Sequence, residues 1–181
     1  MDRGEAFELV KSKISNRNLV KHCLAVEAVM RGLAAHLGED QDYWGLAGLL
    51  HDLDYEETGE DAENHTLVTE RILRERNVDE AIIHTIKCHC DKAPRENLMD
   101  KAIYATDPVT GLIVAAALMH PSKKLKEVDV PFLLRRFKEK RFAAGANREQ
   151  IRTCGDLGLS LEEFLRISLE AMQGIDKELG L

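Results

Sequence analysis

Four histidine and aspartate residues stand out because each lies on, or at the end of, a segment whose apolar face predicts burial. They are His22, the adjacent pair His51 and Asp52, and Asp107. Buried imidazole and carboxylate groups are costly unless they are paired or bind a metal. Imidazole nitrogen combined with carboxylate oxygen suits Mn, Fe, Co, Ni or Zn, whereas a shell of oxygens alone favours Mg or Ca. These four residues therefore predict a divalent transition-metal site.

Two further histidines, His65 and His89, lie on helix faces that periodicity turns toward the protein interior. With them the chain offers six candidate ligands from five helical segments, enough for one or two metal ions. Two ions would share a bridging carboxylate, and Asp52 is the candidate for that position. Other interpretations stay open: the first four residues could form a buried hydrogen-bonded network, and His65 could be solvated in the first turn of a helix.

Helical periodicity dominates the chain and predicts an all-α fold of about eight helices with no strand. The following segments carry the candidate ligands: 18–37, 41–50 with His51 and Asp52 at its end, one capped by Asn64, one starting at Asn77 or Asp79, and 98–117 with Pro108 inside. The acidic run 54–61 is expected to be a loop that could gate the site. Capping residues predict that the later helices begin near Asp129, Asn147 and Ser160.

The segments around the candidate ligands resemble the HD superfamily of metal-dependent phosphohydrolases. The resemblance covers roughly residues 18–118 and rests on these segments in this order: KHCLAVEAVMRGLA, GLAGLLHDLDYE, NHTLVTERIL, AIIHTIKCHC and DKAIYATDPVTGLI. The chain departs from the pattern at two places. Leu53 and Asp54 follow the His-Asp pair where many relatives have Ile-Gly, so the signature is HDLD in place of HDIG. Cys88 precedes His89 where some relatives have a second histidine.

The resemblance implies an HD-domain helical bundle over residues 1–120, with a C-terminal helical extension over 121–181 packed on the same domain. Members cleave phosphate esters or anhydrides of nucleotides and related small phosphorylated metabolites. The expected reaction uses a hydroxide that the metal activates, with His51 and Asp52 as the catalytic pair. Two alternatives remain: a non-catalytic module that binds a ligand or a partner, and a di-iron oxygenase built on the same ligands.

A phosphorylated substrate also needs cationic side chains to hold it. Lys92 and Arg95 follow His89 closely and are candidates for this role, as is Arg148 next to a predicted helix start. Lysine and arginine outnumber the acids between residues 123 and 152, although most of these side chains are expected to form a solvated helical face. The role of this basic segment is left open, and its helices could mediate a homodimer.

The composition excludes several other classes of protein. The formal net charge of −7 argues against a general nucleic-acid binder, so no nucleic-acid partner is expected. No run approaches the roughly 20 consecutive apolar residues of a membrane span, and no signal peptide is visible at the N-terminus, so the predicted location is the cytoplasm without membrane contact. The four cysteines are too few and too irregular for a disulfide framework, and Cys88 and Cys90 are expected to be small thiols of the core.

Overall fold

The computed structural model describes residues 1–59 and 61–181, and it confirms the predicted all-α helical bundle. Every regular element in the described part of the chain is a helix. In chain order these are α1 (Arg3–Lys13), α2 (Arg17–Leu37), α3 (Gln41–Leu50), α4 (Tyr55–Thr58), α5 (Leu67–Glu75), α6 (Glu80–Cys88), α7 (Leu98–Met119), the 3-10 helix η1 (Leu125–Glu127), α8 (Val130–Lys138), α9 (Arg148–Arg152), the 3-10 helix η2 (Thr153–Leu157), α10 (Leu161–Gln173) and α11 (Asp176–Leu179).

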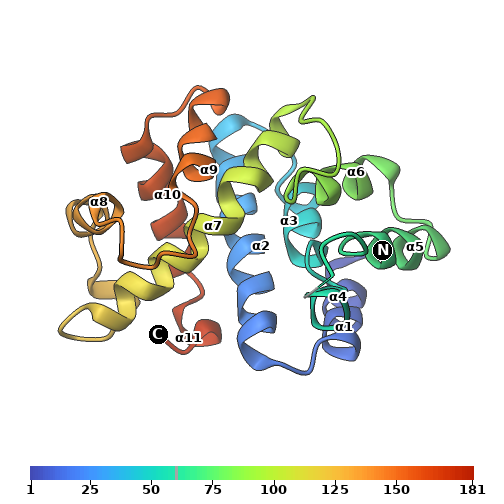
Figure 1. The fold of residues 1–181 in the computed structure, drawn as a ribbon, viewed down its shortest axis with the longest axis horizontal. Coiled ribbons are helices and arrows are strands. Elements are labelled where there is room, and N and C mark those ends of the chain that lie inside the picture. Colours follow the sequence, from blue (N-terminus) through green and yellow to red (C-terminus); the bar gives the residue numbers. More distant parts are fainter. Residues whose placement is uncertain (60) are drawn as a thin grey trace.

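The two longest helices, α2 and α7, cross at the centre of the molecule (Figure 1). Asn16 caps α2, and Gly38 ends it in the left-handed region with φ of 76°, which glycine adopts without steric cost. The middle of the apolar stripe of α2, including Val26 and Leu33, is fully buried. Helices α3, α7 and α10 all pack on α2. This helix therefore joins the half of the molecule that carries α5 and α6 to the half that carries α8 and α10.

Helix α7 is a core helix. Asn97 and Asp100 form a capping box at its start, and the helix continues through Pro108, which has no N–H to donate to the carbonyl of Tyr104. By length and composition alone α7 could span a membrane, since its mean hydropathy reaches 1.5. However, 56% of that stretch is buried inside the protein, where α7 packs against α2, α6, α9 and α10. The burial of α7 in the protein core therefore explains why its sequence is so apolar.

The close contact between α2 and α3 depends on Gly48. A Cβ atom at this position would lie 2.9 Å from the carbonyl oxygen of Val26 and 3.0 Å from the backbone of Glu27. We expect Gly48→Ala to lower the free energy of unfolding by about 1–3 kcal/mol, because two backbones would have to separate. Gly111→Ala is the matched control: a Cβ there meets nothing within 4 Å, and alanine favours a helix. Denaturant unfolding of both variants measures the difference, and equal stability would contradict the close-packing argument.

Several local predictions need correction. The acidic run 54–61 is not entirely a loop, since Tyr55–Thr58 forms the short helix α4; Glu60 lies outside the described residues. Helix α5 begins after Thr66 rather than after Asn64, whose side chain instead bonds Asp61. The helices of the tail begin where predicted, at Asp129, Asn147 and Ser160, although only Ser160 of these three forms a capping box. Because α10 and α11 contact α2, the tail packs on the core; the boundary at residue 120 stays a prediction.

Candidate metal centre

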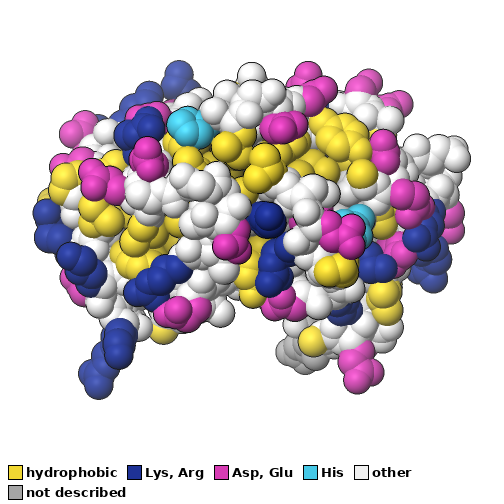
Figure 2. Space-filling model, turned by 90° about the horizontal axis from the view of Figure 1, so that it is seen from above, with side chains coloured by type: hydrophobic (Ala, Val, Ile, Leu, Met, Phe, Trp, Pro, Cys, Tyr) yellow, Lys and Arg dark blue, Asp and Glu magenta, His cyan; other side chains and the backbone are white. Residues whose placement is uncertain are grey.

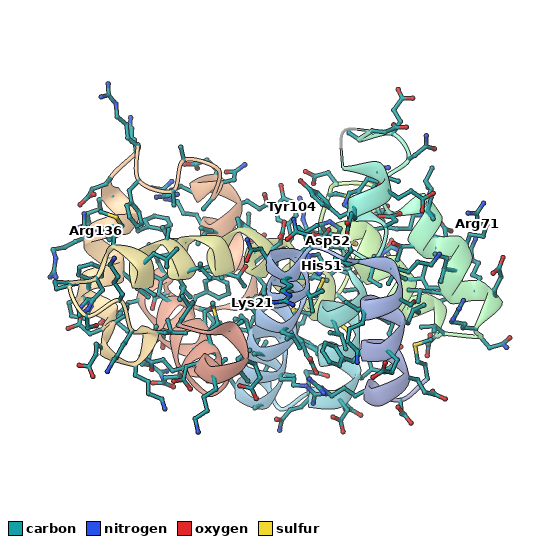
Figure 3. The ribbon with its side chains drawn as sticks, turned by 90° about the horizontal axis from the view of Figure 1, so that it is seen from below. Lys21, His51, Asp52, Arg71, Tyr104 and Arg136 are labelled. Carbon is teal, nitrogen blue, oxygen red and sulfur yellow. The ribbon has the colours of Figure 1, made fainter. Side chains whose placement is uncertain are left out.

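Five helical segments bring the six predicted ligands together. His22 lies in the second turn of α2, His51 and Asp52 directly follow α3, and His65 lies just before α5. His89 follows α6, and Asp107 lies in the middle of α7. Figure 3 shows His51 and Asp52 near the middle of the molecule, beneath the space between its two halves.

His22, His51 and Asp107 form the first group of donor atoms. The Nε2 atom of His22 lies 3.2 Å from Nε2 of His51 and 3.0 Å from Oδ1 of Asp107. His51 Nε2 lies 3.8 Å from the same Asp107 oxygen. The three donor atoms thus surround a single point, as ligands of one ion do.

Asp52 joins this first group to a second one formed by His65 and His89, whose Nε2 atoms are 3.0 Å apart. Its Oδ2 atom faces the first group, at 3.6 Å from His22 Nε2 and 3.4 Å from His51 Nε2. Its Oδ1 atom faces the second, at 3.5 Å from Nε2 of both His65 and His89. One carboxylate thus offers an oxygen to each of two histidine pairs, which is the arrangement of a bridging ligand.

The other ring nitrogen of each histidine contacts an acceptor outside the centre. The Nδ1 atom of His51 contacts the Gly48 carbonyl at 2.8 Å, and that of His89 contacts the Ile86 carbonyl at 2.6 Å. His65 Nδ1 contacts Asp54 Oδ1 at 2.9 Å. His22 Nδ1 contacts the hydroxyl of Thr110 at 3.2 Å, and this hydroxyl itself donates to the Asp107 carbonyl.

This network assigns the proton of each neutral imidazole to Nδ1 and leaves the Nε2 lone pairs facing one another. Lone pairs of two nitrogens at 3.0–3.2 Å repel unless a proton or a metal ion lies between them. The donor set therefore fits one ion in each group, with the Nδ1 contacts fixing the orientation of the rings.

The electrostatics of the centre also favour a cation. Burial alone would raise the pKa of Asp52 and Asp107, but the neighbouring histidines hold the pKa of both carboxyls well below the usual range. Burial would lower the pKa of His51, but Asp52 and Asp107 outweigh it and raise the pKa to about 9. Without a metal, the centre therefore holds a proton near neutral pH where a metal ion would otherwise bind.

A cavity of about 440 Å³ opens over the centre. Figure 2 shows the surface hollowed between the half of the molecule that carries α8 and the half that carries α5 and α6. Besides the ligands, the cavity is lined by Leu19, Tyr55, Cys90 and Gln150. Tyr55 packs edge-on against the ring of His65, and Gln150 donates to the His89 carbonyl at 3.3 Å. Sequence reasoning missed both residues as part of the site: Tyr55 lies in the segment GLAGLLHDLDYE but was assigned no role, and Gln150 reaches the site from the distant helix α9.

The two cysteines near His89 have different surroundings. Cys90 lines the cavity, and its sulfur lies within 4.8 Å of the donor atoms of His65 and His89. Cys88 is fully buried on the other side of the chain, where burial raises the pKa of its thiol to about 12 and the thiol donates to the Pro94 carbonyl. His84 contacts the same carbonyl at 3.0 Å.

The predicted substrate-binding cations make contacts within the protein. The ammonium of Lys92 donates to the carbonyls of Glu63 and His65, and so fixes the turn that carries a candidate ligand. Arg95 pairs with Asp91 and stacks on Tyr104 at 3.8 Å from the ring centre. None of the three, Arg148 included, is among the described residues that line the cavity over the centre. Their contact with a substrate stays a prediction.

Asp54 supports His65 from outside the centre. Its carboxylate is buried, accepts hydrogen bonds from the backbone N–H groups of Thr66 and Thr69, and contacts the His65 ring. Burial would raise its pKa, but these bonds lower it, so the carboxylate stays ionised.

We expect Asp54→Asn to weaken metal binding about tenfold, because residues that hold the ligands in place typically contribute 10–100-fold to metal affinity. Chelator competition measures the affinity, with the exposed Asp156→Asn as control; equal affinity in both would contradict this role.

Comparison with known proteins places the chain in a family. Three curated relatives are similar to it: ribonuclease Y of Nitratidesulfovibrio vulgaris (strain DP4), 30% identical over 53% of this chain; ribonuclease Y of Sulfurovum sp. (strain NBC37-1), 26% over 74%; and ribonuclease Y of Lawsonia intracellularis (strain PHE/MN1-00), 28% over 56%. The matched regions cover only 18%, 27% and 20% of these relatives. The family model described as HD domain matches residues 19–129, which contain all six predicted ligands. The chain therefore belongs to the HD domain family.

Proposed function

We propose that the protein is a metal-dependent phosphohydrolase that cleaves a phosphate ester or anhydride of a nucleotide or a related small phosphorylated metabolite. The observation that carries the proposal is the position of Asp52, whose two carboxylate oxygens face two separate histidine pairs. His22, His51 and Asp107 would complete the first metal site, and His65 and His89 the second. Membership of the HD domain family supports this assignment.

Two bound divalent ions would supply a nucleophile at neutral pH and neutralise charge on the phosphoryl oxygens. The carboxylates Asp52 and Asp107 neutralise only half the charge of two such ions, so the centre would attract an anionic substrate. The imidazole Nδ1 contacts keep the ligands oriented without rearrangement during the reaction. Tyr55 and Gln150 offer a hydroxyl and an amide from the cavity wall, where a substrate would make hydrogen bonds.

The related ribonucleases raise a second candidate, hydrolysis of an RNA phosphodiester. A transition-metal centre would stabilise the negative charge on the phosphoryl oxygens of either substrate in the same way. The chemistry of the ligands therefore favours neither substrate. The overall charge of −7 favours the small substrate. A cytoplasmic location and a homodimer remain part of this proposal as predictions.

Chromatography of the cleaved products, together with phosphate release, tests the proposal. The protein would be incubated with nucleotides, dinucleoside polyphosphates, sugar phosphates and a short oligoribonucleotide, each with Mn, Co, Ni, Fe, Zn or Mg. We expect metal-dependent cleavage of one substrate class. Oxygen uptake without hydrolysis of any substrate, by protein that holds two iron ions, would instead support the di-iron oxygenase. Nucleotide binding without turnover under any metal would support a non-catalytic module.

A further inference from the structure

The basic segment 123–152 contributes a second cavity beside the metal centre. This cavity has a volume of about 560 Å³ and lies at the end of α8 and around α9. Four basic side chains line it: Lys138, Lys140, Arg148 and Arg152. Among the described residues, Glu149 is the one acid in the lining, and it pairs with Arg152. A strongly cationic cavity thus stands in a chain whose net charge is −7.

The charges in this cavity are available to a ligand to different degrees. Lys138 and Lys140 are exposed and form no ion pair within residues 1–59 and 61–181. Arg148 instead has a structural role. Its guanidinium donates to the carbonyls of Phe137, Phe142, Ala143 and Ala146, which fixes the loop between α8 and α9. Arg148 therefore shapes the cavity and adds charge to it, while the two lysines are free to contact an anion.

A third cavity connects the metal centre to the basic one. It has a volume of about 400 Å³ and shares His22, Asp107 and Gln150 with the cavity over the centre. It shares Gly145, Ala146 and Asn147 with the basic cavity. A Cβ atom at Gly145 would meet nothing within 4 Å, so this part of the wall is open. The three cavities therefore adjoin one another around the start of α9, and together they are called the groove.

The geometry of α9 separates the two ends of this groove. Gln150 faces the metal centre, whereas Arg148 and Arg152 lie two residues away on either side and face the opposite direction, since each helical residue turns about 100°. A helix with its side chains is roughly 10 Å wide. A ligand that touches both ends must therefore extend roughly 10 Å from the metal centre and carry negative charge at both ends.

We infer that the basic cavity binds a second phosphate group of an extended, polyphosphorylated substrate while the metal centre holds the phosphate that is cleaved. Lys138 and Lys140 contact this second phosphate, and Arg148 and Arg152 add positive potential. The inference rests on the proposed function, because it names the kind of substrate that the centre receives. The second phosphate belongs either to the phosphoanhydride chain of a nucleotide or to a neighbouring nucleotide of an oligonucleotide.

Binding of inorganic triphosphate to the metal-free protein tests the cavity without any hydrolysis. The test variant combines Lys138→Glu with Lys140→Glu. The control variant combines Lys123→Glu with Lys124→Glu, two exposed lysines of the same basic segment outside the cavity. We expect calorimetry to show affinity about tenfold weaker in the test variant, because two charge-assisted contacts are lost, and a change below twofold in the control. Equal losses in both variants, or unchanged binding in the test variant, would overturn the inference.

Hydrolysis by the metal-loaded protein then identifies the source of the second phosphate. Three substrates are compared: a single-phosphate aryl ester, a nucleoside triphosphate and a short oligonucleotide. In the test variant we expect kcat/KM to fall about tenfold more, mainly through KM, for one of the two polyphosphorylated substrates than for the ester. An equal fall for all three would overturn the inference. Failure to hydrolyse any of them, with triphosphate binding intact, would contradict the proposed function and leave the anion site in place.

Discussion

Replacing Asp52 by Ala is expected to reduce hydrolysis by about 10³-fold or more and to lower the bound metal to at most one ion per chain. Removing a single neutral hydrogen-bond donor from a catalytic centre already lowers the rate by about 10²–10³-fold. Asp52 is charged and contacts the proposed reacting centre, so we expect the loss of rate to be at least as large. Asp52 faces both histidine pairs, so its removal affects both groups of ligands at once. Phosphate release and elemental analysis of the purified variant measure the two effects.

Asp52→Asn separates the charge of this residue from its shape. The amide fills the same space but offers only one oxygen, so it can serve one histidine pair and not both. We expect the Asn variant to hold one ion and to be as inactive as the Ala variant. Asp156→Ala removes an exposed aspartate of η2 and serves as the control, with full activity and metal content. Near-normal turnover in either Asp52 variant, with its helical content retained, would contradict the proposed mechanism.

The sequence predicted which side chains come together at the candidate centre better than it predicted the other residues that line the cavity over it. His22, Asp52 and Asp107 lie on or beside regular helices, where periodicity decides which way a side chain points. Their convergence then needs only that these helices pack around one core. Tyr55 and Gln150 follow no such rule, because their positions depend on the short helices α4 and α9 and on how the tail folds back over α7.

The predicted role of Arg148 shows a second limit of sequence analysis. A basic residue beside a helix start is typical of an anion site, and composition cannot show whether its N–H groups are already occupied. In the structure its guanidinium donates to four carbonyls of the preceding loop. The ammonium of Lys92 likewise donates hydrogen bonds to two backbone carbonyls. Only the path of the loops reveals these contacts, and loops carry little periodic signal.

Metal affinity of the centre is expected to rise about tenfold per pH unit from pH 6 until it levels off near pH 9. In the metal-free protein the pKa of His51 is raised to about 9, chiefly because Asp52 and Asp107 outweigh the effect of burial, so a metal ion must displace a proton below that pH. Competition with a chromophoric chelator across this range measures the affinity. Calorimetry in buffers of different ionisation enthalpy should show about one proton released per first ion at pH 7. A flat affinity profile would contradict this assignment.

The same pKa shifts fix how the stability of the metal-free protein depends on pH. The pKa of His51 is higher in the folded than in the unfolded chain, so its contribution is complete below about pH 6.5 and is lost as the pH rises through about 9. Asp52 and Asp107 have lowered pKa values, so their contributions are present above about pH 4 and are lost as the pH falls. We therefore expect the Tm of the metal-free protein to fall between pH 7 and about pH 9.5. The metal-loaded protein should not show this fall, because a bound ion replaces the proton whose loss destabilises the metal-free centre.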